Sequence, residues 1–332
     1  MADSGEDLLI RFEELTKTFK VSSRGFGSER ITAVDHVSFS IRRGETFGLV
    51  GESGCGKSTF SKIALRLVEA TSGSVFYEGR DIYKMPFRQL REIRRDMQVV
   101  FQDPYDSLNP RLTLEELAAE PLRVHKQGGK AARRERVESL FNDVGLPTSI
   151  MGRYPHQLSG GQRQRLCIAR TLALSPKFII LDEAVSALDV SIQAQILNLL
   201  QDLKKQFNLT YLFISHNLSV VKFASDRIGV MYFGRIIEIA EKRELFSNVL
   251  HPYTYALLSA IPGAGLEAEK RRALMQAGAP SIFNAPKGCA FSSRCPWSKD
   301  MCGKEPPTLK DMGGGHCAAC HFAGELELNL GL

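Results

Sequence analysis

The sequence predicts an α/β fold with a mainly parallel central sheet and a smaller appended unit. Two strand patterns and the composition lead to this prediction. Residues 46–50 are apolar and run into a glycine-rich turn, after which apolar residues recur at helical spacing. Residues 178–181 form a second apolar strand that ends in an acidic pair. With 332 residues, of which 43% are hydrophobic, the chain can bury at least one full core.

Composition indicates a protein that is neither secreted nor membrane-spanning. No stretch approaches the roughly 18 continuous apolar residues of a transmembrane helix, and residues 1–10 are acidic where a secretory signal would be basic. We therefore expect a cytoplasmic protein, in which clustered cysteines bind metal more often than they form disulfides. The net charge of +6 suits polyphosphate, a membrane surface or nucleic acid alike.

The glycine-rich turn has the pattern of a phosphate-binding loop. Gly51, Gly56, Lys57 and Ser58 match G-x-x-x-x-G-K-[ST] in the required order of strand, loop and helix. The glycines allow backbone N–H groups to point inward at a phosphate, and the helix N-terminus adds a favourable dipole. We expect Lys57 to hold the β- and γ-phosphates and the Ser58 hydroxyl to bind Mg²⁺. We interpret Cys55 as a small filler rather than a nucleophile.

The strand at 178–181 runs directly into Asp182 and Glu183. An apolar strand that ends in a carboxylate is what a Mg²⁺ site beside a phosphate loop requires. We expect Asp182 to hold the metal ion through water, and Glu183, one residue further on, to polarise the attacking water. The alternative is an acidic pair that merely starts a helix, and the presence of the phosphate loop makes this the weaker interpretation.

The segment LSGGQ at 158–162, followed by a basic helical run, resembles the signature motif of ABC-type ATPases. Other motifs of that family lie in the expected order. VVFQDP is similar to the Q-loop, SALD to the D-loop and LFISHNL to the switch region, while LTKTFKV places an aromatic ring where the family contacts adenine. The residues concerned are Gln102, Asp189, His216 and Phe19.

The resemblance covers residues 8–262 and implies a P-loop NTPase of the ABC nucleotide-binding type. Such a domain has a RecA-like core, an antiparallel β subdomain and a helical signature subdomain, which we place at about 105–175. We therefore expect residues 1–262 to be the ABC ATPase nucleotide-binding domain. Residues 263–332 are then a small cysteine-rich C-terminal extension, with its cysteine cluster at about 278–322.

The resemblance also implies that the ATP site is shared between two subunits. The chain contains one phosphate loop and one signature motif, so a complete site needs a partner chain. A serine-led helix N-terminus forms an anion site, and in the family it binds the γ-phosphate held by the other subunit. The signature residues are Ser159, Gly160, Gly161 and Gln162. ATP-binding residues are expected to be Phe19, Gly51, Ser53, Gly54, Cys55, Gly56, Lys57, Ser58, Thr59, Gln102 and Asp182, with Mg²⁺ held by Ser58, Gln102 and, through water, Asp182.

Catalysis depends on two residues in this scheme. Glu183 polarises the attacking water, and His216 hydrogen-bonds the γ-phosphate across the closed site. The sequence departs from the family beside both residues, with Ala184 where proline is common and Asn217 where aspartate is common. Alanine does not fix φ as proline does, so we expect Ala184 to loosen the turn after Glu183. Neither change removes a catalytic side chain.

Several stretches resemble a narrower branch, the ATPases of oligopeptide and dipeptide importers, and within it the F-type subunit. They include VGESGCGKST, FQDPYDSLNPR, RYPHQLSGGQRQR and HPYTYALLSAIP. This resemblance implies an ATPase coupled to peptide import. Its partners would be a second, related ATPase subunit, two transmembrane permease subunits that dock at residues 103–112 and, indirectly, an extracytoplasmic peptide-binding protein. The expected location is peripheral, on the cytoplasmic face of the inner membrane.

Two other functions are alternatives. A soluble ABC ATPase that acts on nucleic acid or ribosomes usually has two ATPase units or a long coiled insertion, and this sequence has neither. The basic runs RQLREIRR and KAARRER are short, so we expect no nucleic-acid partner. An importer ATPase for nickel or another solute is compatible with the motifs, because specificity lies in the binding protein and the membrane subunits.

Five of the seven cysteines follow residue 288, in a loop-rich segment too short to bury much core of its own. GCAFSSRCP and the closing ACH resemble the C-terminal extension of peptide-importer ATPases. Family members with a 4Fe–4S cluster imply Cys289, Cys295, Cys302 and Cys320 as its ligands. A zinc site made of four thiolates and free thiols without metal are alternatives. Other candidate ligands are Cys317, as an alternative to Cys320, and more weakly His316 and His321.

Overall fold

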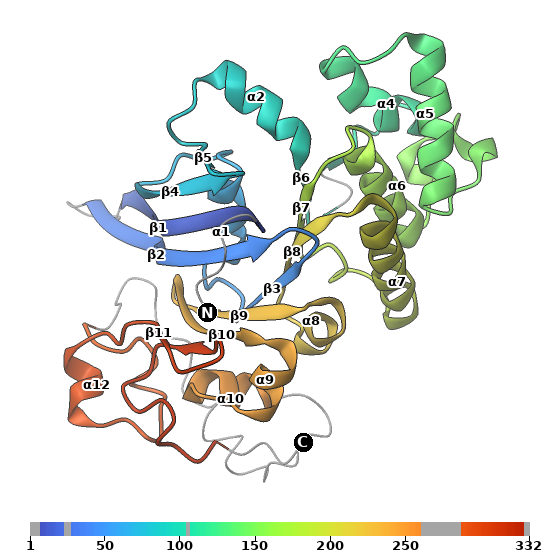
Figure 1. Ribbon diagram of the computed structural model, residues 1–332. Helices are drawn as coiled ribbons and strands as arrows, with labels where there is room; N and C mark the ends of the chain where they lie inside the picture. The colour runs from blue at the N-terminus through green and yellow to red at the C-terminus, as the bar shows by residue number, and fades with distance from the viewer. Residues whose placement is uncertain (1–6, 23–27, 104–106, 260–286, 329–332) are drawn as a thin grey trace. The chain divides into compact units, whose positions relative to one another are not determined.

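The computed structural model describes residues 7–22, 28–103, 107–259 and 287–328, and Figure 1 shows their elements along the chain. The chain divides into two compact units. The first is built from residues 1–42, 46–84 and 215–332, and the second from residues 43–45 and 85–214. The predicted domain boundary at 262–263 lies outside the described residues.

In the first unit, an antiparallel sheet has the strand order β2-β1-β4-β5 (Figure 1). Further strands follow the order β11-β12-β10-β9-β3, in which β9 and β3 are parallel and the other pairs antiparallel. The strands are β1 (Leu8–Ser22), β2 (Ser28–Arg42), β3 (Thr46–Val50), β4 (Ser72–Tyr77), β5 (Arg80–Asp81), β9 (Arg227–Tyr232), β10 (Arg235–Glu241), β11 (Lys310–Asp311) and β12 (Cys317–Ala318). The helices are α1 (Lys57–Ala64), α8 (Leu218–Ala224), α9 (Lys242–Ser247), α10 (Pro252–Leu258) and α12 (Asp300–Lys304).

The second unit contains the parallel strands β8-β7-β6 and a group of helices in which α4, α5 and α6 pack on one another. The strands are β6 (Met97–Val100), β7 (Phe178–Asp182) and β8 (Thr210–Ser215, whose last residue belongs to the first unit). The helices are α2 (Phe87–Asp96), α4 (Leu114–Val124), α5 (Lys130–Asp143), α6 (Gly160–Leu172) and α7 (Val190–Phe207), with short 3-10 helices η1 (Thr148–Ile150) and η2 (Pro155–Gln157). None of the helices in the described ranges is both long enough and apolar enough to cross a membrane.

The sequence explains where these elements begin and end. Every residue of β3, β7 and β8 is buried, as expected of apolar parallel strands that are covered on both faces. Thr113 and Ser159 form capping boxes that start α4 and α6, and Asp189 caps α7. Asn208, with φ of 50°, ends α7 in the left-handed conformation. The capping residues thus fix the helix starts that carry the signature and D-loop segments.

Four phenylalanines form the centre of the core of the first unit. The ring of Phe60, on α1, lies 4.9 Å from that of Phe12 and 5.4 Å from that of Phe39. Phe39 also stacks on Phe47 with 4.5 Å between ring centroids. These rings come from β1, β2, β3 and α1, so the antiparallel sheet, the strand before the phosphate loop and the helix after it share one core.

The C-terminal segment, residues 287–328, is attached to the rest of the first unit through β12, which pairs with β10. Beside this pairing, the carboxylate of Glu238 is fully buried and accepts hydrogen bonds from the N–H groups of Leu250 (2.8 Å) and His251 (3.0 Å). Its Oε1 also lies 2.8 Å from Nε2 of His316. A buried carboxylate needs such partners, and here they join β10, the start of α10 and the C-terminal segment.

Replacing Phe60 by alanine should lower the free energy of unfolding by about 3–5 kcal/mol, because it removes a fully buried ring and leaves a cavity. Phe223→Ala changes the same residue type in the same unit, but this ring is 48% exposed. We expect Phe223→Ala to cost only about 1 kcal/mol. Urea unfolding followed by circular dichroism measures both variants, and equal losses would contradict the assigned core.

Candidate functional site

Close backbone contacts fix the shape of the phosphate loop, which follows β3 and leads into α1. A Cβ atom on Gly51 would lie 2.2 Å from the carbonyl oxygen of Met231 on β9. A Cβ atom on Gly56 would lie 2.1 Å from the carbonyl oxygen of Ala33 on β2, and the φ of Gly56 is 111°. No side chain fits at either position, so both glycines are required by space, and Gly56 by its backbone angle as well.

The ammonium group of Lys57 lies inside this loop. The residue is 4% exposed, and its Nζ donates hydrogen bonds to the carbonyl oxygens of Gly51 (2.8 Å) and Glu52 (2.9 Å). Cys55 is also buried, and burial raises the pKa of its thiol, which agrees with its interpretation as a filler. The other loop residues predicted to bind ATP, Ser53, Gly54, Ser58 and Thr59, are exposed or half-buried.

Two further predicted site residues lie on the surface of the first unit. Phe19, on β1, is 39% exposed, and Nζ of Lys17 lies 5.0 Å from the centroid of its ring. His216 follows β8 and is exposed. Asn217, next to it, accepts hydrogen bonds at Oδ1 from the N–H groups of Ser219 (3.0 Å) and Val220 (3.4 Å). Asparagine at this position therefore caps α8, as an aspartate would.

In the second unit, β7 ends at Asp182, which is 4% exposed. Glu183 follows with φ of 51°, a left-handed conformation that costs free energy in a residue other than glycine. Its carbonyl oxygen accepts hydrogen bonds from both N (3.1 Å) and Oγ (2.9 Å) of Ser186. These two bonds close the turn after Glu183. Gln102 lies two residues after β6 and is exposed.

The signature segment forms the exposed N-terminus of α6. Ser159 Oγ accepts a hydrogen bond from the N–H of Gln162 (3.3 Å), while the N–H of Ser159 donates to Oε1 of Gln162 (3.1 Å). Gly161 is buried, and a Cβ atom there would lie 2.6 Å from Cγ2 of Ile192 on α7. Asp189 caps α7 at the N–H of Ile192 (3.0 Å), and hydrogen bonds from this N–H and from Ser191 lower the pKa of the carboxyl.

The structure thus places the predicted ATP-binding residues in two groups. The first unit contains the phosphate loop, Phe19 and His216. The second contains Gln102, Asp182, Glu183, the signature residues and Asp189. Most residues of each group lie at the ends of strands or the starts of helices of their own unit.

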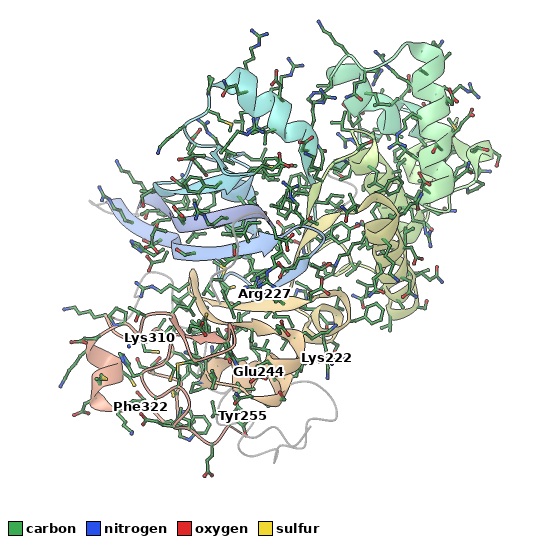
Figure 2. The ribbon with its side chains drawn as sticks, in the orientation of Figure 1. Lys222, Arg227, Glu244, Tyr255, Lys310 and Phe322 are labelled. Carbon is green, nitrogen blue, oxygen red and sulfur yellow. The ribbon has the colours of Figure 1, made fainter. Side chains whose placement is uncertain are left out.

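The four cysteines proposed as ligands from the resemblance line one cavity of the first unit: Cys289, Cys295, Cys302 and Cys320. Phe291, Trp297, Phe322 and Leu326 line the same cavity. Figure 2 labels Phe322, from the C-terminal segment, and Tyr255, from α10, whose ring lies 5.9 Å from that of Trp297. Burial raises the pKa of Cys295 to about 12 and that of Cys320 to about 11, so binding a cation here would release thiol protons.

Cys317, the alternative fourth ligand, does not line this cavity. It lies on β12, paired with Ile239 of β10. His316 pairs with Glu238, whereas His321 borders the cavity, with its Nε2 2.9 Å from the carbonyl oxygen of Glu305. Within the described ranges, no group of three or more His, Cys, Asp or Glu side chains is placed to hold a metal ion.

The sequence analysis missed two residues that contact the site. Both guanidinium nitrogens Nη1 and Nη2 of Arg294 lie 3.1 Å from the carboxylate oxygens of Glu52, the second residue of the phosphate loop. The N–H of Glu52 donates a hydrogen bond to the Tyr253 hydroxyl (2.9 Å). Arg294 and Tyr253 stand within GCAFSSRCP and HPYTYALLSAIP, segments that resemble the family but whose individual side chains were given no role.

Two family models match the chain. One, described as ABC transporter, matches residues 34–186, and the other, described as oligopeptide/dipeptide transporter, C-terminal region, matches residues 237–302. The chain is 47% identical over 327 residues to the oligopeptide transport ATP-binding protein AppF of Bacillus subtilis, covering 97% of this chain and 99% of that one. It is also 47% identical over 312 residues to a putative peptide import ATP-binding protein of Brucella ovis, covering 92% and 98%.

Solved structures with the same fold support these matches. The ATP-binding cassette MJ0796, a dimer in a post-hydrolysis state with ADP and Pi, is 32% identical with a TM-score of 0.63, covering 70% of this chain and 99% of that one. The protein cbiO1 of Clostridium perfringens, part of an ABC transporter complex, is 26% identical with a TM-score of 0.63, covering 73% and 91%.

Gly161→Ala should destabilise the second unit, because its Cβ would overlap the side chain of Ile192. Overpacking costs about 1–3 kcal/mol and outweighs the gain of up to about 1 kcal/mol in helix propensity. Gly160→Ala is the matched control, since its Cβ would meet Leu188 at an ordinary 3.5 Å. We expect Gly160→Ala to be neutral or stabilising in urea unfolding.

The same measurement in an Ile192→Ala background tests the cause. In that background, Gly161→Ala should not lower the free energy of unfolding, because the side chain that it would overlap has been removed. A loss of stability that persists without the Ile192 side chain would show that the glycine is required for another reason.

Proposed function

The chain belongs to the oligopeptide transport ATP-binding proteins of the ABC transporter family, and we propose from this membership that it hydrolyses ATP to power the import of peptides through a membrane permease. The observation that carries the proposal is the match to relatives named for peptide transport over nearly the whole chain. It includes both the ATPase segment and the C-terminal region described for oligopeptide and dipeptide transporters.

In this proposal, the first unit binds the nucleotide. Lys57 and the N–H groups of the phosphate loop bind the β- and γ-phosphates, and the half-exposed ring of Phe19 contacts adenine. The hydroxyl of Ser58 and the amide oxygen of Gln102 are hard oxygen ligands of the kind that Mg²⁺ prefers, and Asp182 holds the ion through water. The buried position of Lys57 among loop carbonyls supports its role, because a phosphate can replace those carbonyls as its partner.

Hydrolysis requires a water aligned with the γ-phosphate. Glu183 accepts a hydrogen bond from this water and polarises it, while His216 donates a hydrogen bond to the γ-phosphate. Mg²⁺, when bound, neutralises the charge that develops on the phosphate oxygens.

A second ATPase subunit completes the site. The start of α6, with Ser159, Gly160, Gly161 and Gln162, is an anion site that binds the γ-phosphate held by the partner subunit, and Ser159 and Gly160 are exposed there. Asp189 of the D-loop starts α7, which packs against Gly161. ATP therefore joins two subunits and hydrolysis separates them, and the proposed partner is a related but non-identical chain.

The remaining partners are membrane and extracytoplasmic proteins. ABC ATP-binding subunits of this family work with membrane permeases, and here we propose two transmembrane permease subunits and, acting through them, a peptide-binding protein. The proposed location is peripheral, on the cytoplasmic face of the inner membrane. The docking segment proposed at 103–112 includes residues 104–106, which are not among those described.

The cavity lined by Cys289, Cys295, Cys302 and Cys320 is proposed to bind a 4Fe–4S cluster. Four thiols on one cavity are the donor set that such a cluster uses. A zinc site made of four thiolates would use the same donors and is the alternative.

Glu183→Gln should bind MgATP but lower the rate of hydrolysis by at least about 100-fold, because the amide cannot polarise the water as a carboxylate does. ATP should then trap the two ATPase subunits as a closed dimer, measured by gel filtration with and without ATP. Glu92→Gln, the same change on the exposed surface of α2, is the control and should leave turnover unchanged. Undiminished turnover in Glu183→Gln would remove Glu183 from its role.

Anaerobically purified protein should absorb at the blue-violet edge of the visible spectrum and contain iron and sulfide. Cys295→Ser or Cys320→Ser should lose most of both, because each removes a thiol from the cavity. Cys317→Ser is the matched control and should keep them, since this residue lies on β12 outside the cavity. A colourless protein with one zinc per chain would favour the zinc alternative, and a metal-free one would leave the cysteines as free thiols.

A further inference from the structure

Arg294 and Glu52 form a two-pronged ion pair between the cysteine-rich segment and the phosphate loop, both within the first unit. Nη1 and Nη2 of Arg294 each lie 3.1 Å from a different carboxylate oxygen of Glu52. The Arg294 side chain is only 6% exposed, and that of Glu52 is 30% exposed. A bidentate pair of this kind is stronger and more directional than an ordinary surface ion pair, so it restrains the orientation of both partners.

Glu52 is in turn fixed to the rest of the loop through its backbone. Its N–H donates to the Tyr253 hydroxyl, and its carbonyl oxygen accepts hydrogen bonds from Nζ of Lys57 (2.9 Å) and from the N–H of Cys55 (3.3 Å). The residue held by Arg294 therefore also holds the ammonium group that we propose to bind phosphate. A displacement of the Glu52 backbone would shift both the loop and Lys57.

On the other side, Arg294 is held by the segment that carries the thiols. Its N–H donates to the carbonyl oxygen of Phe291 (3.0 Å), and its guanidinium lies 5.5 Å from the centroid of the Phe291 ring. Phe291 packs edge-on against Tyr232 (5.6 Å) and Tyr253 (5.5 Å) and also lines the cysteine cavity. Cys295 follows Arg294 directly, so a residue that lines the cavity and the residue that pairs with Glu52 are neighbours in the chain.

We propose that Arg294 is a positioning residue of the ATP site, which holds the phosphate loop in shape and makes MgATP binding depend on the state of the cysteine-lined cavity. The inference rests on the proposed function, since it concerns the same ATP site. Electrostatics gives a second reason for the pair: without Arg294, the Glu52 carboxylate would stand unneutralised beside incoming phosphate groups and repel them.

A double-mutant cycle on the ATPase reaction of the full chain separates this role from a merely structural one. Arg294→Gln should raise the KM for MgATP about tenfold or more while kcat at saturating ATP stays within about twofold, because it leaves a carboxylate unpaired in the loop. Adding Glu52→Gln should lower KM again, since the repelling charge is gone. If the ion pair served only to attach the C-terminal segment, the double variant would have a KM as high as that of Arg294→Gln. This result would overturn the proposal.

Three further variants keep the test decisive. Arg294→Lys, which keeps the charge but loses the two-pronged geometry, should give an intermediate KM and serves if Arg294→Gln does not fold. Lys310→Gln is the matched control: Lys310 lies on β11 in the same C-terminal segment, is exposed and does not line the cysteine cavity, so its loss should leave KM unchanged. Cys295→Ser should raise KM in the wild-type background and not in Arg294→Gln; an equal rise in both would overturn the coupling through Arg294.

The outcomes also distinguish failure of the proposed ATPase function from failure of the positioning role of Arg294. A wild-type chain that hydrolyses no ATP with its partner subunit present would refute the proposed function. A wild-type chain that hydrolyses ATP, together with an Arg294→Gln variant of unchanged KM, would refute only the positioning role of Arg294.

Discussion

The nucleotide site depends on how closely the phosphate loop lies against two strands. At Gly51 the loop approaches the carbonyl of Met231 on β9, and at Gly56 it approaches the carbonyl of Ala33 on β2, in both cases too closely for a side chain. The backbone N–H groups that would bind phosphate are therefore positioned by the two sheets of the first unit. Tyr232, one residue beyond Met231, contacts Phe291 of the C-terminal segment, so a single strand supports both the loop and the extension.

In the second unit, residues that begin helices supply polar groups of the proposed site. The Oγ of Ser159 accepts the N–H of Gln162, and this bond leaves the hydroxyl proton free to be donated to an anion at the helix N-terminus. Gly161 is buried against Ile192 of α7, so the signature helix and the helix that Asp189 begins are packed together. Movement of one of these segments would be passed to the other through this contact.

Sequence patterns over short stretches predicted the secondary structure around the phosphate loop and before Asp182. Strand, loop and helix around Lys57, and the buried strand that ends at Asp182, follow from apolar runs and glycine spacing, and the structure contains both. The left-handed backbone of Glu183 depends on the fold around it, which periodicity does not reveal. The pair of Glu52 and Arg294 joins residues 242 positions apart, beyond the reach of any local pattern.

The C-terminal segment is too short to bury much core of its own, and the sequence left a cluster, a zinc site and free thiols as alternatives for its cysteines. The structure adds other attachments: β12 pairs with β10, His316 contacts the buried carboxylate of Glu238, and Phe291 packs among aromatic rings of the first unit. Release of the segment would remove His316 from the buried Glu238 carboxylate and leave it with the N–H groups of Leu250 and His251, so this contact opposes release. The segment therefore has attachments that do not involve the thiols, and a group bound by the thiols is not needed to hold the segment in place. Binding of such a group could instead change the position of Arg294 and, through Glu52, of the phosphate loop.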